Sequence, residues 1–146
     1  MSHSSGLKGE IITPPDKSIS HRALMFSSLA DGKSVIRNLL YGGDVLTTMN
    51  AMRSLSIEID DDGKEVTVYG RGLRGISEPH NVIDCGNSGT TTRLLSGILA
   101  GNSLFSVLTG DDSLRNRPMG RIINPLIQMG AGISARGGNK YLPMCI

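Results

Sequence analysis

Three clusters in the sequence place Lys or Arg beside Ser, Thr, Asn and Gly where a helix is predicted to begin. The first spans residues 14–22 and reads Pro-Pro-Asp-Lys-Ser-Ile-Ser-His-Arg. The first turn of a helix attracts anions, because its backbone N–H groups are free and the helix dipole is positive there. Lys17 adds a mobile charge, Ser18 adds a hydroxyl, and Arg22 follows one turn later on the same face. The cluster predicts a carboxylate or phosphate site; a merely capped turn with Ser18 as N-cap and solvated Lys17 and Arg22 is the open alternative.

The second cluster, residues 84–93, runs from a predicted strand through a turn rich in Gly and hydroxyl side chains into a helix. Gly86 and Gly89 have no Cβ, so the backbone of this turn can approach a ligand closely. Arg93 lies about one turn into the helix. The turn lacks the Gly-Lys-Ser/Thr ending of a P-loop, so nucleotide binding is not implied. A purely structural turn, with Arg93 in an ion pair, is the competing interpretation.

The third cluster, residues 110–121, carries three arginines around a proline. Pro118 suits the first turn of a helix, which puts Arg117 at the mouth of that helix. A guanidinium group can bind a phosphate through two parallel hydrogen bonds, which an ammonium group cannot do as well. We therefore predict Arg117 as the phosphate ligand. Arg115 and Arg121 are expected to pair with neighbouring aspartates on the surface.

The remaining composition argues against several other classes of function. His3, His21 and His80 have no partners at the spacings of a metal site or a catalytic triad, so we expect no metal and no catalytic histidine. The 146 residues are 38% hydrophobic, which excludes a disordered chain. A net charge of +2 and 3% aromatic residues give no support for nucleic-acid binding.

The helices and strands predicted around these clusters fall into two similar halves of the sequence. Each half has the order strand, helix, strand, helix, strand, strand. The predicted elements are strand 9–13, helix 18–30, strand 34–39, helix 43–55 and strands 57–60 and 66–69, followed by strand 82–85, helix 88–99, strand 103–108, helix 118–129 and two strands flanking Gly137 and Gly138.

This order predicts an α/β fold built from two βαβαββ repeat units, at about residues 9–70 and 82–146, within one partial domain of residues 1–146. The sequence Leu-Ala-Asp-Gly-Lys-Ser at residues 29–34 is echoed by Leu-Ala-Gly-Asn-Ser at residues 99–103, at the same place in each unit. The predicted last strand of the second unit ends the sequence abruptly, so we expect a chain cut from a longer protein.

The sequence also indicates a cytoplasmic location. Residues 1–10 lack the apolar core of a secretory signal. Cys85 and Cys145, each in a short apolar segment, suit reduced thiols better than a disulfide. The uncharged stretch 94–110 is interrupted by glycines, so we predict a buried helix and a buried strand there and no membrane span.

The three clusters, taken in order, resemble the signatures of the EPSP synthase (3-phosphoshikimate 1-carboxyvinyltransferase) family. The matching residues are Asp-Lys-Ser-Ile-Ser-His-Arg at 16–22, Gly-Asn-Ser-Gly-Thr-Thr-Thr-Arg-Leu-Leu at 86–95, and Asp-Ser-Leu-Arg-Asn-Arg-Pro-Met at 112–119. The resemblance covers essentially the whole chain. The family enzyme is about three times longer, so the chain corresponds to its amino-terminal portion.

The resemblance implies an inside-out α/β fold in which helix N-termini converge on a cleft between two domains. It implies a transferase of the shikimate pathway, which leads to chorismate and the aromatic amino acids. That enzyme joins the carboxyvinyl group of phosphoenolpyruvate to the 5-hydroxyl of shikimate 3-phosphate and releases phosphate, with no metal or organic cofactor. The partners of this chain would be the two substrates and the missing carboxyl-terminal portion, which carries the acid and base groups. The chain alone is therefore expected to have no turnover.

The resemblance also implies roles for individual residues. Lys17 would contact both substrates and be the catalytic residue of this part. Ser18 and Arg22 would hold the shikimate carboxylate. The phosphate of phosphoenolpyruvate would be received by the Gly89 turn, with Asn87 and Thr90 as supporting neighbours, and by Arg117.

Three other interpretations stay open at this point. The related enolpyruvyl transferase that acts on a UDP-sugar shares the fold, although the motifs at 16–22 and at Arg117 favour the shikimate enzyme. The chain could also be a non-catalytic anion-binding module. Finally, it could be one subunit of a split enzyme that a second polypeptide completes.

Overall fold

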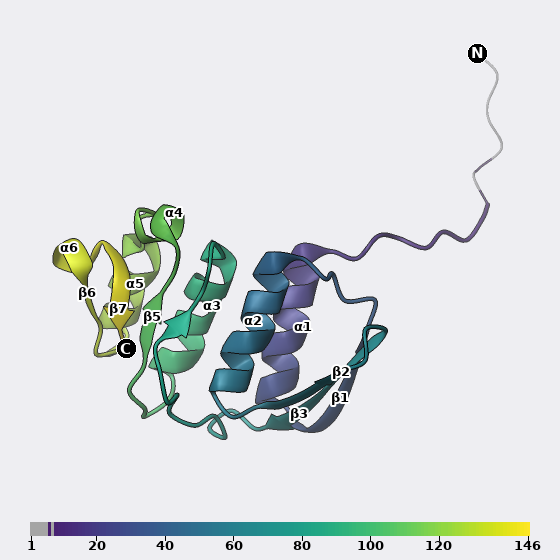
Figure 1. Ribbon diagram of the computed structural model, residues 1–146, viewed down its shortest axis with the longest axis horizontal. Helices are drawn as coiled ribbons and strands as arrows, with labels where there is room; N and C mark the ends of the chain where they lie inside the picture. Colours follow the sequence, from purple (N-terminus) through teal and green to yellow (C-terminus); the bar gives the residue numbers. More distant parts are fainter. Residues whose placement is uncertain (1–5, 7) are drawn as a thin grey trace, which may run out of the picture.

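The computed structural model describes residue 6 and residues 8–146 (Figure 1). His3 lies outside these described residues. The elements, in chain order, are α1 (Lys17–Leu29), β1 (Asp31–Arg37), α2 (Gly43–Ser54), β2 (Glu58–Asp61), β3 (Glu65–Arg71), β4 (Ile83–Asp84), α3 (Gly89–Ala100), β5 (Val107–Thr109), α4 (Asp112–Arg115), α5 (Gly120–Gln128), β6 (Ser134–Ala135), α6 (Arg136–Asn139) and β7 (Tyr141–Cys145).

The strands form two separate sheets. In the first sheet the order is β1-β3-β2 and both pairs are antiparallel. In the second sheet the order is β4-β5-β7-β6, with β4 and β5 parallel and the other pairs antiparallel. Val66 and Val68 of β3 are fully buried while their neighbours are half-buried, so this strand alternates toward the core as a period of two requires.

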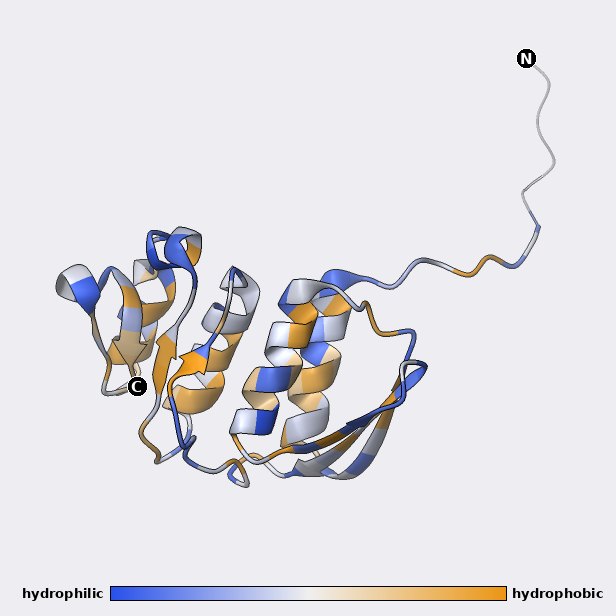
Figure 2. Ribbon diagram, viewed as in Figure 1, coloured by the Kyte–Doolittle hydropathy of each residue, from blue (hydrophilic) through white to orange (hydrophobic). Residues whose placement is uncertain are grey.

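The helices α1, α2 and α3 lie side by side and begin at the same end of the molecule (Figure 1). Apolar residues recur along the three helices and along strands of both sheets (Figure 2). Leu24 of α1, Val45 of α2 and Leu95 of α3 are completely buried in the core that results. Because the three first turns share one end, the fold gathers the free N–H groups of three helices there.

The predicted strand at residues 9–13 is wrong. These residues have no regular structure, and Ile11 and Ile12 are 83% and 94% exposed. In the predicted second unit the corresponding strand is β4, which pairs with β5. The expected partner of residues 9–13 in the first unit is β1, and β1 pairs only with β3. A strand requires a hydrogen-bonded neighbour, and the segment before α1 leads away from the described elements (Figure 1). The α/β class and the main helices are as predicted, while the duplication of one unit stays a prediction.

The uncharged stretch 94–110 forms the greater part of α3 and continues to the end of β5. Within the described residues, no helix combines the length and the apolar character needed to cross a membrane.

Candidate anion-binding site

The start of α1 is organised by Asp16. This residue is the N-cap, and its Oδ1 accepts a hydrogen bond of 2.7 Å from the backbone N–H of Ile19. The hydroxyl of Ser20 donates to the Asp16 carbonyl at 2.7 Å. Asp16 therefore is the N-cap, a role expected of Ser18 if the first cluster were merely a capped turn. Ser18 itself lies exposed in the first turn.

The cations at the start of α1 differ in what they contact. Lys17 forms an ion pair with Asp44 in the first turn of α2, and the Lys17 side chain is still 53% exposed. Arg22 is also exposed, one turn further along α1. The role of Asp44 was missed in the sequence, because it depends on α2 packing beside α1. The arrangement leaves an arginine and a hydroxyl facing solvent while the lysine is held near two helix starts.

The start of α3 is formed by the turn that leaves β4. Gly86 has a φ of 52°, a left-handed conformation that favours glycine, and its N–H donates to Asp84 Oδ1 at 2.8 Å. Ser88 is the N-cap and accepts from the Thr91 N–H at 3.1 Å. The backbone of Gly89 is buried, and Thr90 is half-buried beside it.

A hydrogen-bonded series connects this turn to the third cluster. Asn87 accepts from Arg117 Nη2 at 2.5 Å and donates to Asp111 Oδ2 at 2.7 Å. Asp111 also caps α4 by accepting from the Leu114 N–H at 2.7 Å. This backbone bond, the Asn87 amide and the nearby Arg117 charge lower the pKa of the Asp111 carboxyl group. Asp111 is thus a fixed anion that orients Asn87, which in turn orients Arg117.

Two guanidinium groups flank Gly89. A Cβ placed on Gly89 would lie 2.5 Å from Arg93 Nη1 and 3.4 Å from Arg117 Nη1. Arg93 donates to the carbonyls of Gly89 and Pro118, each at 3.3 Å, so the ion pair considered for it is absent among the described residues. The absence of a side chain at Gly89 is therefore what lets both cations lie against the first turn of α3.

The structure brings four of the predicted site residues together at α3: Asn87, Gly89, Thr90 and Arg117. The other three, Lys17, Ser18 and Arg22, lie together at α1. Their ligands and roles stay predictions.

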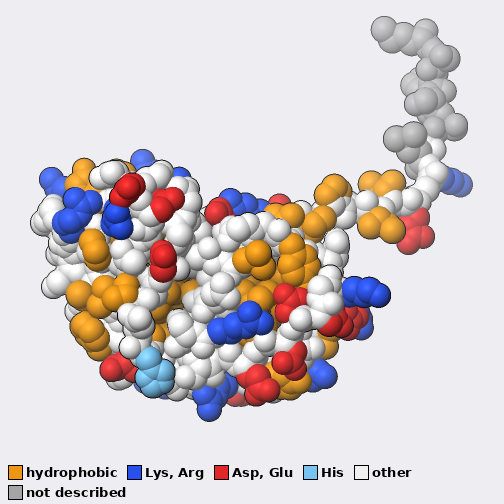
Figure 3. All heavy atoms as spheres, in the orientation of Figure 1, with side chains coloured by type: hydrophobic (Ala, Val, Ile, Leu, Met, Phe, Trp, Pro, Cys, Tyr) orange, Lys and Arg blue, Asp and Glu red, His pale blue; other side chains and the backbone are white. Residues whose placement is uncertain are grey.

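The other two arginines of the third cluster, Arg115 and Arg121, differ in their contacts. Arg115 forms the predicted ion pair with Asp112 and also donates to the Gly110 carbonyl at 3.0 Å. Arg121 is exposed on α5 and makes no ion pair within the part of the chain that is described. Basic and acidic side chains lie close together over α4 (Figure 3). Arg117 lies between the end of α4 and the start of α5, and α5 begins at Gly120, two residues later than the helix predicted from Pro118.

The described residues contain no group of three or more His, Cys, Asp or Glu side chains that could hold a metal ion. Both cysteines are free thiols. Cys85 is completely buried at the end of β4, and burial raises the pKa of its thiol to about 11. His21 is also buried and lies within hydrogen-bonding distance of Thr48 at 2.6 Å.

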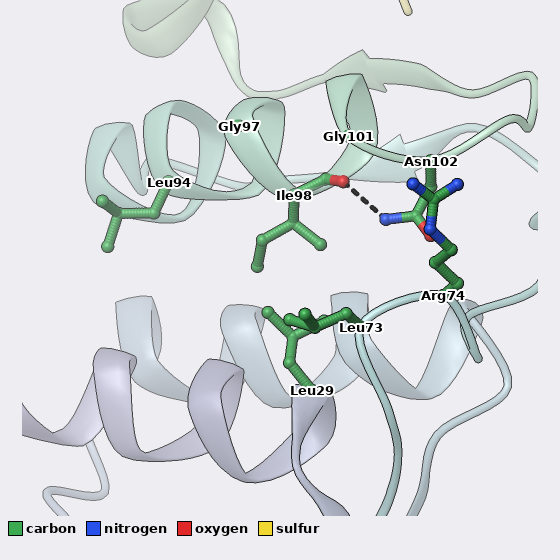
Figure 4. A pocket seen from close by; sticks show the side chains of 8 residues that line it. All are labelled: Leu29, Leu73, Arg74, Leu94, Gly97, Ile98, Gly101 and Asn102. Carbon is green, nitrogen blue, oxygen red and sulfur yellow. Dashed lines mark hydrogen bonds between the residues drawn. The ribbon is translucent and has the colours of Figure 1, made fainter.

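An apolar groove of about 410 Å³ lies away from these helix starts, between the end of α1 and the second half of α3. Leu29 and Leu73 face Leu94 and Ile98 across it (Figure 4). Its polar lining is confined to Arg74 and Asn102, and Asn102 donates to the Ile98 carbonyl at 2.9 Å. A pair of anionic substrates would find few hydrogen-bond donors in this groove, so we place the candidate site at the helix starts.

The model of the family EPSP synthase (3-phosphoshikimate 1-carboxyvinyltransferase) matches residues 1–146. The chain belongs to the EPSP synthase family. The expectation drawn from the three clusters of the sequence is therefore confirmed.

Individual EPSP synthase relatives agree with this assignment. The chain is 62% identical over 141 residues to a 3-phosphoshikimate 1-carboxyvinyltransferase of Thermodesulfovibrio yellowstonii, covering 96% of this chain and 33% of the relative. It is 53% identical over 144 residues to the protein of the same name from Lactococcus lactis, covering 99% and 34%. The solved EPSP synthase of Acinetobacter baumannii superposes with a TM-score of 0.89 at 42% identity, covering 94% and 32%. The chain thus spans about a third of the length of these EPSP synthases.

Proposed function

We propose that this chain is the amino-terminal part of a transferase that moves the carboxyvinyl group of phosphoenolpyruvate to the 5-hydroxyl of shikimate 3-phosphate. The observation that carries the proposal is the arrangement of two cation-bearing helix starts, those of α1 and α3, at one end of three packed helices. Two anionic substrates repel each other, and N–H dipoles with cations on both sides offset that repulsion.

Each helix start suits one of the two ligands. At α1, Ser18 and Arg22 are exposed and would bind the carboxylate of shikimate 3-phosphate. At α3, the Gly89 backbone, Thr90 and the Arg117 guanidinium held by Asn87 would bind the phosphate of phosphoenolpyruvate.

Lys17 would contact both substrates from between the two helix starts. The Lys17 ammonium group is on a flexible stem and pairs with Asp44, so substrate anions would compete with that carboxylate for it.

The reaction requires proton transfers that we assign to the part of the protein beyond this chain. The 5-hydroxyl oxygen would attack C2 of phosphoenolpyruvate as a proton is added to C3, and the tetrahedral adduct would then lose a proton from C3 and expel phosphate. Asp111 caps α4 with a lowered pKa, so it is not suited to donate a proton, and the carboxylate of Asp44 is paired with Lys17. The chain alone would bind anions without turning them over.

Exposed apolar side chains on and beside helices α1, α2 and α3 support the need for the carboxyl-terminal portion of the protein. Ile19 and Phe26 of α1 are 61% and 66% exposed, Leu73 is 72% exposed and Leu94 is 41% exposed. Apolar side chains are visible over the helical middle of the molecule (Figure 3). An apolar surface of this kind marks a place where another part of a protein packs. We infer that the carboxyl-terminal portion covers it, whether as the same polypeptide or as a second subunit.

A cytoplasmic location is part of the proposal. Cys85 and Cys145 are both free thiols, and thiols persist in reducing compartments. Fractionation of the cells that make the protein, followed by immunoblotting, tests this; recovery in a secreted fraction would contradict it.

The proposed function is tested by measuring phosphate release from phosphoenolpyruvate and shikimate 3-phosphate. The assay uses the chain alone, a complementary carboxyl-terminal portion of an EPSP synthase alone, and the two mixed. Turnover only in the mixture supports the proposal. Arg117→Ala should lower the turnover at subsaturating phosphoenolpyruvate by about tenfold or more, while Arg121→Ala, a matched arginine outside the site, should not. Turnover by the chain alone would contradict the assignment of proton transfer to the missing portion. Anion binding without turnover in any mixture would favour an anion-binding module.

A further inference from the structure

A series of buried side chains crosses from α1 through α2 to α3. His21 Nδ1 lies 2.6 Å from Thr48 Oγ1, which lies 2.7 Å from Thr91 Oγ1. Thr91 Oγ1 then lies 2.6 Å from Ser88 Oγ, the N-cap oxygen of α3. The bonded residues are separated by 27, 43 and 3 positions in the sequence, so the series exists only because the three helices pack together.

All four side chains of the series are completely or almost completely buried. His21, Thr48, Ser88 and Thr91 each have a relative exposure of 0%. Buried hydroxyl and imidazole groups require partners, and in a series of this kind each group fixes the orientation of the next. Replacing the Thr48 hydroxyl would leave His21 Nδ1 without its partner, whereas Thr91 would keep its bonds to Ser88 and to the Asp44 carbonyl.

One atom of the series has no partner. His21 Nε2 is buried and makes no hydrogen bond within the described residues. A leucine at this position would avoid the cost of burying an unpartnered nitrogen. The imidazole is thus more costly than an apolar side chain for packing alone, and the bond from Nδ1 to Thr48 is the contact within the described residues that offsets this cost.

Both ends of the series lie within the candidate anion-binding site. His21 follows Lys17 by one turn on α1, and Ser88 precedes Gly89 and supports the Thr91 N–H at the start of α3. In the middle, Thr48 follows Asp44 by one turn on α2, and Asp44 is the ion-pair partner of Lys17. The carbonyl of Asp44 also accepts from the Thr91 hydroxyl at 3.3 Å.

We propose that His21 and Thr48 are positioning residues, which hold the anion-binding starts of α1 and α3 at a fixed spacing through the hydroxyls of Thr91 and Ser88. The inference rests on the proposed function, because the spacing matters when two substrates must react with each other. A small change in the distance between bound reactants lowers the rate of their reaction more than it weakens the binding of either one. The residues themselves touch no substrate.

The positioning role is tested first on the chain itself, by amide hydrogen exchange. Thr48→Val removes the central hydroxyl and keeps the shape of the side chain. We expect the Ser20 and Thr91 amides, in the first turns of α1 and α3, to exchange about tenfold faster, whereas the Ser28 and Leu99 amides change less than twofold.

Two matched variants accompany this measurement. Thr48→Ser keeps the hydroxyl and should restore exchange rates close to those of the unchanged chain. Ser96→Ala removes a buried hydroxyl that bonds only within α3, to the Thr92 carbonyl at 2.6 Å, and should leave the first turn of α1 unaffected. A uniform acceleration at all four amides in Thr48→Val, or no acceleration, would overturn the proposal.

The second measurement uses the chain mixed with the complementary carboxyl-terminal portion. Thr48→Val and His21→Leu should each lower kcat about tenfold or more, with KM for either substrate changed less than threefold. Equal losses in kcat and in the affinity for one substrate would instead indicate a direct binding role. If the unchanged mixture shows no turnover, the proposed function fails, and the exchange measurement still decides whether the series spaces the two helices.

Discussion

The two helix starts of the candidate site differ in how much of their chemistry is fixed before a ligand arrives. At α3, Asn87 and Arg117 are bonded to each other, and Asn87 is bonded to Asp111. At α1, Ser18 and Arg22 are exposed, and Lys17 makes an ion pair across to α2. Under the proposed function, α3 would present a phosphate site whose groups are already held in place, whereas Ser18 and Arg22 of α1 would be fixed by the substrate itself.

The largest effect should come from removing the cation at the α3 start. Arg117→Ala deletes a guanidinium group and leaves Asn87 Oδ1 without its donor. Since hydrogen bonds to charged groups contribute about 1.5–3 kcal/mol, the affinity for phosphoenolpyruvate should fall by about 10- to 100-fold. Titration calorimetry measures this, and Arg117→Lys should recover only part of the loss because an ammonium lacks the planar pair of donors.

A substitution at Gly89 tests whether preorganisation depends on the missing side chain. In Gly89→Ala the new Cβ would meet Arg93 Nη1 at 2.5 Å and Arg117 Nη1 at 3.4 Å, so both guanidinium groups must move. Because the ends of long side chains can move at little cost, we expect the fold to persist and the affinity for phosphoenolpyruvate to fall about tenfold, or about 1.4 kcal/mol.

Gly97→Ala is the matched control for this substitution. A Cβ on Gly97 meets no atom within 4 Å, and alanine favours a helix by about 1 kcal/mol over glycine. This variant should therefore be more stable to urea and should bind phosphoenolpyruvate with unchanged affinity. Weaker binding in both variants would show that the arginines are not what Gly89 accommodates.

The buried imidazole beneath the two starts predicts a dependence of stability on pH. Burial lowers the pKa of His21, with the charge of Lys17 adding to this effect and that of Asp44 opposing it. The unfolded chain therefore binds a proton at this residue below about pH 6.5, where the folded chain does not yet bind one. The free energy of unfolding should fall as the pH decreases from about 6.5, with a slope from this residue of at most about 1.4 kcal/mol per pH unit.

Urea denaturation at several pH values between 5 and 7.5 measures this slope. His21→Gln should flatten it, whereas His80→Gln, at an exposed histidine, should leave it unchanged. An unchanged slope in His21→Gln would assign the dependence to other groups.

The smallest effect should come from freeing Lys17. Asp44→Asn removes the ion pair, and a pair this exposed contributes about 0–1 kcal/mol to stability. The released lysine should raise the affinity of the α1 start for inorganic phosphate about two- to threefold, as followed by the amide shifts of Lys17 and Ser18. Glu58→Gln makes the same change in net charge at an exposed site on β2 and should have no such effect. Equal gains in both variants would make the effect one of net charge.

Local patterns in the sequence were enough to predict the four longer helices, α1, α2, α3 and α5. Apolar spacing and capping residues placed α1 and α3 to within a residue or two. The first turns of these helices contain Lys17, Ser18 and Thr90, and Arg22 lies one turn further along α1. The strand at 9–13 was predicted wrongly, because the β-branched residues Ile11, Ile12 and Thr13 favour a strand without showing whether a partner strand exists. The helix α4 was not predicted, since four residues give no helical period to detect.

The contacts that hold the site residues in place could not be predicted from such local patterns. The pairing of Lys17 with Asp44 and the bond between Asn87 and Arg117 each join different elements and depend on how the helices pack. Asp111 is one of the aspartates expected to pair with an arginine on the surface. Its position as the cap of α4 gives it a different neighbour, Asn87. Residue type and spacing thus identified the groups that could bind anions, while only packing shows which of them are fixed.

The buried thiol of Cys85 can report local opening of the structure at the end of β4. The thiolate form of a cysteine attacks an alkylating reagent, and Cys85 has a pKa of about 11 and no exposed surface. It can therefore be labelled only when the end of β4 separates from its neighbours, while the half-buried Cys145 provides an internal reference on the same sheet. The rate of iodoacetamide modification at Cys85, followed by mass spectrometry, would consequently measure how often the turn that carries Gly89 comes apart. Slower labelling in the presence of phosphoenolpyruvate would reveal ligand binding without any turnover.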